Sequence, residues 1–282
     1  MSLVFLFSFE IQAEALNIPF HFEPEASALF DYDVHLSCIP GKSSKVMVCF
    51  HGYGGNYQIA YRVKEHAGIE DTLISFNFPD HDIVQRKLNP EQMSFGTIEE
   101  LLPCLYVLKN SVIDYGMDEI DLYGFSAGGG AIINAIGVLN THTHDQSLQK
   151  IGIGEQEKQT ILKAIQRGYV ILDTPLKSLE EIIDLRGSCY ELEVIARRYR
   201  ENQFVPIESL QYLNNLSLQI VVHFQEKDDT IFNRDDPLFI ERLKKYNESG
   251  NTFVILGDDG GHSAPHPSLW QYYADLRQEQ KM

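Results

Sequence analysis

Cysteine and basic residues are scarce in this chain of 282 residues. The four cysteines, Cys38, Cys49, Cys104 and Cys189, are far apart and form no CxxC pair, which argues against a zinc cluster or a redox pair. We therefore expect reduced thiols. Lys and Arg number 23 against 40 Asp and Glu, a formal net charge of −17. This acidic balance argues against a nucleic-acid partner.

Long apolar runs, internal repeats, low-complexity tracts and linkers rich in Pro, Gly or Ser are also missing. Because no run of about 18 apolar residues exists, no segment is predicted to span a membrane as a helix. Residues 3–9 are apolar and Ala13-Glu14-Ala15 resembles a cleavage site, but no Lys or Arg precedes the stretch. We therefore favour a cytoplasmic protein that begins with a β-strand; export with residues 1–15 as a signal peptide is the alternative.

What is present favours one α/β domain. Hydrophobic residues make up 44% of the chain, enough for a sizeable core. Short apolar runs alternate with longer amphipathic segments, a pattern typical of a mostly parallel sheet with helices on both faces. The predicted strands are 45–51, 71–78, 119–124, 168–172, 218–224 and 252–256.

Two stretches interrupt this alternation within the predicted single domain of residues 1–282. A polar loop and a helical segment occupy residues from about 140 to 167, which we interpret as an insertion. Residues from about 177 to 216 contain short helical segments and no strand. We interpret this second stretch as a small helical cap over one end of the sheet.

The strongest functional signal is Gly124-Phe125-Ser126-Ala127-Gly128, at the junction of a predicted strand and a predicted helix. A sharp turn of this kind needs glycines beside the serine, since the backbone folds back on itself. The turn also places Ser126 at a helix N-terminus, whose free N–H groups favour negative charge. We therefore predict Ser126 as a nucleophile; a glycine-rich turn with an incidental serine is the structural alternative.

A second glycine-rich segment, His51-Gly52-Tyr53-Gly54-Gly55, follows the predicted strand 45–51. A serine that attacks a carbonyl needs N–H donors directed at the oxygen that becomes negative. We assign these oxyanion-hole donors to the backbone N–H of Tyr53, with Gly54 as the alternative, together with that of Ala127. An ordinary turn before the next helix is the competing interpretation.

A proton acceptor and an acid are expected after the last predicted strands. His262, which follows two glycines, is the preferred general base because imidazole takes and returns a proton near neutrality; His266 is its competitor. Asp228, just past strand 218–224, is the preferred acid for orienting the imidazole. Asp229 and Asp173 remain alternatives for that role.

Four features of the chain follow, in order, the pattern of the α/β-hydrolase superfamily: the segment 51–55, the GxSxG motif at 124–128, Asp228 and His262. The chain resembles that superfamily from about residue 34 to its end. The resemblance implies a site at the carboxyl ends of the parallel strands. One departure concerns the acid, because Gln225 stands where the family usually has a glycine after the strand.

These residues predict a serine hydrolase that cleaves a carboxylic ester-type bond through an acyl-enzyme on Ser126. Such a reaction needs no cofactor or metal, and the expected partner is a small-molecule acyl substrate. His142 and His144 have a spacing compatible with a metal, but their polar surroundings favour a solvated turn. A thioesterase or acyltransferase with the same triad, or a non-catalytic ligand-binding module on the same fold, are the alternative functions.

Overall fold

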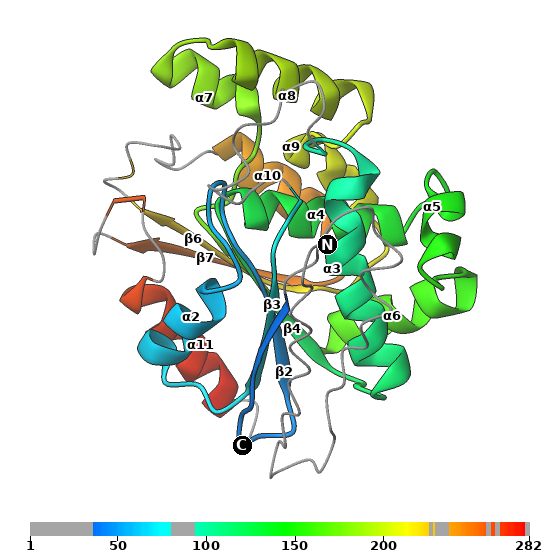
Figure 1. Cartoon of the computed structure of the whole chain (residues 1–282). Helices are drawn as coiled ribbons and strands as arrows, with labels where there is room; N and C mark the ends of the chain where they lie inside the picture. The colour runs from blue at the N-terminus through cyan, green and yellow to red at the C-terminus, as the bar shows by residue number, and fades with distance from the viewer. Residues whose placement is uncertain are drawn as a thin grey trace, which may run out of the picture.

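Seven strands form one sheet in the order β1-β3-β2-β4-β5-β6-β7 (Figure 1). The computed structural model describes residues 36–79, 94–225, 228, 237–257, 261–262 and 266–279. β1 runs antiparallel to β3, and every other neighbouring pair is parallel. The prediction of a mostly parallel sheet is confirmed. The strands are β1 (Leu36–Ile39), β2 (Val46–Phe50), β3 (Thr72–Phe76), β4 (Ile120–Phe125), β5 (Tyr169–Asp173), β6 (Gln219–Gln225) and β7 (Asn251–Gly257).

Helices cover both faces of this sheet, as predicted (Figure 1). They are α2 (Ile59–Ala67), α3 (Ile98–Lys109), α4 (Ala127–Leu139), α5 (Asp145–Lys150), α6 (Glu155–Arg167), α7 (Leu179–Arg186), α8 (Tyr190–Glu201), α9 (Pro206–Ser209), α10 (Pro237–Tyr246) and α11 (Pro267–Glu279). A π-helical turn, η3 (Asn110–Asp114), extends α3, and a 3₁₀ turn, η4 (Leu210–Leu213), extends α9.

Each face of the sheet has its own apolar cluster. Val48 and Phe50 of β2 pack with residues of α3, α4, α6 and α10 on one face. Met47 and Cys49, which alternate with them along the same strand, pack with α2 and α11 on the other. A strand buried on both faces is apolar at every position, which is why these strands were visible as continuous apolar runs.

β1 is the strand that periodicity did not predict. It spans only four residues, of which Ser37 and Cys38 lie at its centre, and it pairs with the sheet from the edge. So short a run carries too little alternation to be recognised. The strand expected at residues 3–9 lies outside the described residues.

The two stretches that interrupt the alternation are helical. The first contains α5 and α6, and α6 contacts β4, β5, α3 and α4. The second contains α7, α8, α9 and η4, with α7 and α8 lying beyond the carboxyl ends of the strands (Figure 1).

The amino ends of the strands are tied together by Arg277 of α11. Its guanidinium nitrogens lie 3.1 Å from Asp71 Oδ2, 3.3 Å from Glu119 Oε1 and 3.0 Å from Asp121 Oδ2. Burial raises the pKa of Asp121, while the positive charge of Arg277 acts in the opposite direction. The side chain of Arg277 is only 13% exposed, so this ion-pair cluster is largely shielded from solvent.

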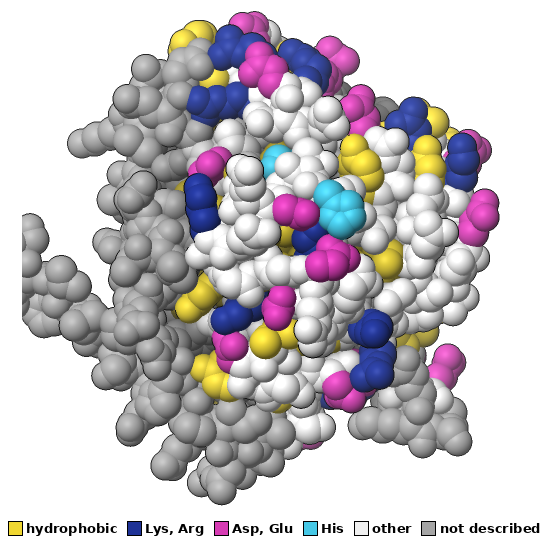
Figure 2. Space-filling model, turned by 90° about the vertical axis from the view of Figure 1, so that its right-hand side faces the viewer, with side chains coloured by type: hydrophobic (Ala, Val, Ile, Leu, Met, Phe, Trp, Pro, Cys, Tyr) yellow, Lys and Arg dark blue, Asp and Glu magenta, His cyan; other side chains and the backbone are white. Residues whose placement is uncertain are grey.

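Charged side chains of both signs are interspersed over the face that carries α5 and α6 (Figure 2). On that side of the molecule His142 is 78% exposed, with its Nδ1 3.2 Å from Asp145 Oδ2, as in a solvated turn. All four cysteines are free thiols. Among the described residues, no helix has both the length and the apolar character needed to cross a membrane.

Candidate active site

Ser126 stands at the sharp turn between β4 and α4. Its backbone has φ 54° and ψ −119°, a region that residues other than glycine rarely adopt. The turn is held in place by its own backbone: the Ser126 N–H donates to the Asp173 carbonyl at 2.9 Å. The Ser126 carbonyl accepts the N–H of Gly129 at 3.0 Å and that of Leu176 at 2.8 Å. These bonds hold the strained conformation against relaxation.

Glycine is required on both sides of Ser126 because the chain passes close to itself. A Cβ atom added at Gly124 would lie 2.7 Å from the carbonyl carbon of Gly128. One added at Gly128 would lie 2.7 Å from the carbonyl oxygen of His51 and closer still to that of Phe50. Real Cβ atoms do not approach other atoms this closely, so the start of α4 sits directly against the end of β2.

Hydrogen bonds join Ser126, His262 and Asp228. The Nε2 atom of His262 lies 2.9 Å from Ser126 Oγ, and its Nδ1 lies 2.8 Å from Asp228 Oδ2. The side chain of Asp228 is fully buried and that of His262 is 13% exposed. The ring of Phe125 packs 4.9 Å from the imidazole, centroid to centroid. An arrangement of this kind can carry a proton from a serine hydroxyl to an imidazole.

Asp228 comes three residues after the last residue of β6 in the sequence. Its N–H donates to the carbonyl of Gln225, the last residue of β6, at 3.2 Å. Gln225 stands where the superfamily pattern has glycine, and Asp228 still reaches His262. Asp229, the alternative acid, lies outside the described residues.

The glycine-rich loop after β2 lies beside Ser126. A Cβ atom added at Gly52 would be 3.2 Å from Ser126 Cβ. His51 secures the loop: its Nδ1 lies 2.8 Å from the carbonyl oxygen of Gly52, and its Nε2 lies 3.0 Å from the N–H of Phe78. The carbonyl needs a donor and the N–H needs an acceptor, so we assign His51 as the neutral imidazole with its proton on Nδ1.

The predicted oxyanion donors lie in this loop and at the start of α4. Tyr53 is 44% exposed, and its phenol donates a hydrogen bond to Glu191 of α8. Gly54 has φ 70°, a conformation that glycine adopts without strain. Ala127 is the first residue of α4, where a backbone N–H has no carbonyl within the helix to bind.

Solved structures with the same architecture exist, although no protein-family model matches the chain and no curated protein sequence is similar to it. A carboxylesterase from Lactobacillus plantarum is 14% identical, with 88% of this chain and 92% of that chain covered and a TM-score of 0.58. An acetyl xylan esterase from a Paenibacillus species is 14% identical, covering 88% and 79%, with a TM-score of 0.53.

Est1E from Butyrivibrio proteoclasticus, solved with ferulic acid bound, is also 14% identical. The match covers 88% of this chain and 95% of that chain, with a TM-score of 0.54. This chain has the α/β-hydrolase fold. The resemblance drawn from the sequence motifs is therefore confirmed at the level of the fold. In the α/β-hydrolase fold, open parallel sheets bind ligands at the carboxyl ends of their strands, the edge at which Ser126 lies.

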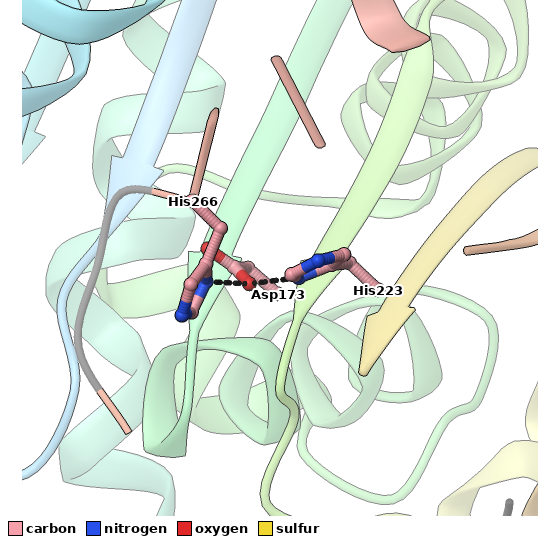
Figure 3. A group of neighbouring side chains, drawn as sticks. All are labelled: Asp173, His223 and His266. Carbon is pink, nitrogen blue, oxygen red and sulfur yellow. Dashed lines mark hydrogen bonds and ion pairs between the residues drawn. The ribbon is translucent and has the colours of Figure 1, made fainter. Parts of the chain in front are cut away.

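A second polar cluster, formed by Asp173, His223 and His266 (Figure 3), lies next to the turn at Ser126. Asp173, the last residue of β5, is the register partner of His223 on β6. Its Oδ1 lies 2.8 Å from His223 Nδ1 and 2.7 Å from His266 Nδ1, and its Oδ2 accepts the phenol of Tyr123 at 2.9 Å. Asp173 thus bonds to His266 and His223, whereas His262 bonds to Asp228.

The Asp173 cluster is buried and held by hydrogen bonds. Burial alone would raise the pKa of Asp173, but hydrogen bonds from His223 and His266 reverse the effect and lower it. Burial and the neighbouring Asp173 carboxylate raise the pKa of Tyr123 well above its usual value, so its phenol stays protonated as a donor.

Asp173, His223 and His266 are also the described residues closest to a metal-ligand set, with ligand atoms within 4.8 Å of one another. Tetrahedral zinc with ligands at about 2.0–2.1 Å would hold those atoms about 3.3 Å apart. The observed separations of 2.7 and 2.8 Å are those of direct hydrogen bonds. His223 was not predicted as a site residue, although its sequence carried a signal: it is an imidazole in an otherwise apolar strand, next to a strand that ends in an aspartate.

Proposed function

We propose that this chain is a serine hydrolase that cleaves a carboxylic ester through an acyl-enzyme formed on Ser126. The observation that carries the proposal is the hydrogen-bonded series Asp228, His262 and Ser126 at the carboxyl edge of the sheet. The similar solved structures are described as a carboxylesterase and an acetyl xylan esterase, which supports an ester as the substrate class.

In the first half of the reaction, Ser126 Oγ attacks the ester carbonyl carbon. The hydroxyl proton passes to His262 Nε2, 2.9 Å away, and the carbonyl oxygen becomes negative. Asp228 keeps the proton of the neutral imidazole on Nδ1 and stabilises the imidazolium that forms. The buried position of the Asp228 carboxylate strengthens this interaction, because water does not screen it.

The developing oxyanion is stabilised by the backbone N–H groups of Tyr53, or Gly54, and Ala127. Losing one donor of this kind typically costs about 2.7–4 kcal/mol of transition-state stabilisation. The start of α4 adds the favourable field of a helix N-terminus. A Cβ atom added at Gly52 would lie only 3.2 Å from Ser126 Cβ, so the glycine-rich loop passes close to the attacking serine.

The tetrahedral intermediate collapses when His262 returns its proton to the leaving alcohol. The alcohol departs and the acyl group stays on Ser126. Water then attacks the acyl-enzyme, with His262 as the general base, and the carboxylic acid is released while Ser126 regains its proton. All groups used in both halves belong to the chain, the substrate or water.

Labelling with a fluorophosphonate probe tests this proposal. Wild-type protein should be labelled at Ser126, as located by peptide mass spectrometry, and should hydrolyse p-nitrophenyl acetate. Ser126→Ala should lose both reactions while its circular dichroism spectrum stays that of the wild type. Folded wild-type protein that neither labels nor hydrolyses esters would refute the proposal.

Paired substitutions test the acid. Asp228→Asn should lower kcat by about 10³–10⁴-fold, because the amide no longer favours the imidazole tautomer that accepts the serine proton. Asp229→Asn is the matched comparison, one residue away, and should have a much smaller effect. The opposite ranking of the two variants would transfer the role of the acid to Asp229.

A further inference from the structure

Hydrogen bonds made by Asp173 and His266 connect Ser126 to Gly261, the residue before His262. The backbone carbonyl of Asp173 accepts the N–H of Ser126 at 2.9 Å. The carboxylate of the same residue lies 2.7 Å from His266 Nδ1, and His266 Nε2 lies 3.2 Å from the carbonyl oxygen of Gly261. Gly261 immediately precedes His262. The buried imidazole of His266 thus connects Asp173, which binds the backbone of Ser126, to the residue that precedes His262.

The partners of His266 determine how many protons its ring carries. A carboxylate oxygen and a backbone carbonyl both accept hydrogen bonds, and neither can donate one. A neutral imidazole has a single N–H, so one ring nitrogen would direct its lone pair at an oxygen lone pair. Both contacts are hydrogen bonds when the ring carries two N–H groups.

His223 provides the contrast within the same cluster. Its Nδ1 also faces Asp173 Oδ1, but its Nε2 lies 3.0 Å from Ser268 Oγ and 3.1 Å from Gln225 Nε2. A hydroxyl and an amide nitrogen can both donate to that ring nitrogen. A His223 ring with its proton on Nδ1 therefore matches the acceptor at Asp173 and the donors at Ser268 and Gln225.

We propose that His266 is a positioning residue, held as an imidazolium cation between Asp173 and Gly261, that keeps His262 at hydrogen-bond distance from Ser126. This inference rests on the proposed function. The ionised carboxylate of Asp173 balances the buried positive charge, and hydrogen bonds to charged groups are about twice as strong as neutral ones.

The other titratable groups around His266 leave this pairing intact. The His223 ring lies 4.8 Å from that of His266, centroid to centroid, and also donates to Asp173. Tyr123 donates to the second carboxylate oxygen of Asp173, and His262 is bound to Asp228. The lowered pKa of Asp173 agrees with an ionised carboxylate and with a proton that stays on the His266 ring.

Nitrogen NMR of the histidine rings in the wild-type protein tests the protonation state directly. At neutral pH, His266 should show two protonated ring nitrogens, whereas His223 should show the pattern of a neutral ring. Elemental analysis of the same sample should find no stoichiometric metal. A neutral His266, or one bound metal ion per chain that is lost on substitution of His266, would overturn the proposal.

Kinetics of His266→Gln test the positioning role. The amide places a donor towards only one of the two oxygens, so kcat for p-nitrophenyl acetate should fall about 10- to 100-fold with little change in KM. Ser268→Ala is the matched control, since it removes a hydrogen bond of the same cluster on the His223 side; its kcat should stay at the wild-type level. A His266→Gln variant with wild-type kcat contradicts the positioning role.

The pH profile separates positioning from a general loss of structure. When wild-type His266 gives up its second proton at alkaline pH, one of its two hydrogen bonds is lost, so kcat should decline there. His266→Gln should lack this decline, and an identical alkaline limb in both proteins would overturn the proposal. Wild-type protein without esterase activity would refute the proposed function alone, because the NMR measurement does not depend on turnover.

Discussion

Substitution of Gly128 by alanine gives the sharpest test of how α4 meets β2. The added Cβ would lie 2.7 Å from the carbonyl oxygen of His51 and closer to that of Phe50. Contacts under 3.0 Å essentially never occur for real Cβ atoms, so the two segments must separate by at least 3.0 − 2.7 = 0.3 Å at His51 and by more at Phe50. Phe50 pairs with Gly124 in the parallel ladder, so the shift acts directly on the turn at Ser126.

Overpacking of this kind typically costs about 1–3 kcal/mol. All three clashing atoms at Gly128 belong to the backbone of Phe50 and His51, which cannot rotate away as a side chain can, so we expect the upper part of that range. Replacing glycine inside a helix returns at most about 1 kcal/mol. The net loss in free energy of unfolding should therefore be about 2 kcal/mol.

Gly137→Ala, in the same helix, is the matched control. Its new Cβ would lie 3.2 Å from Cδ2 of Tyr212, a side chain that can shift by a few tenths of an ångström. Urea unfolding should show Gly128→Ala less stable than wild type and Gly137→Ala close to wild type. The Gly128 variant should also react about 10- to 100-fold more slowly with the fluorophosphonate probe, because displacement of a nucleophile by a fraction of an ångström misaligns its attack. Equal stability of the two variants would refute the reasoning.

Two further predictions concern charge. Arg277→Ala should lower the free energy of unfolding by about 3–5 kcal/mol, because it leaves the buried Asp121 carboxylate without its cationic partner. Arg167→Ala is the control: it breaks an exposed pair with Asp118 and should cost no more than about 1 kcal/mol. Similar losses for the two variants in urea titrations would contradict this prediction. Asp173 has a lowered pKa in the folded protein, so the unfolded chain binds more protons in the acid range. Its contribution to stability should be complete above its unfolded pKa and lost as the pH falls through the folded value. The Asp173→Asn variant should lack this acid-dependent contribution to the free energy of unfolding. The same pH dependence of unfolding in the variant and the wild type would refute this prediction.

Local patterns were sufficient to predict most of the fold. Strands such as 119–124 and 218–224 were identified within one residue at each end, because buried parallel strands are apolar throughout. The turn at Ser126 was predicted equally well, because close backbone contacts require glycine on both sides of it and those glycines appear in the sequence. β1 was missed because a four-residue edge strand has no recognisable period.

The candidate site was harder to predict where partners come from distant segments. The choice among Asp228, Asp229 and Asp173 depended on which carboxylate meets which imidazole, and spacing along the chain does not encode that distance. His266 is the clearest case: its place before a helix suggested a simple helix start, whereas its contact with Asp173 joins segments 93 residues apart in the sequence.

The division of the interior into two apolar layers has a consequence for how this gene can vary. Consecutive residues of β4, such as Leu122 and Tyr123, serve different layers. Inserting or deleting one residue within the strand would exchange the two sets of side chains and move Ser126 by one residue along the strand direction. A change of one residue in the length of a central strand should therefore disturb both apolar layers at once.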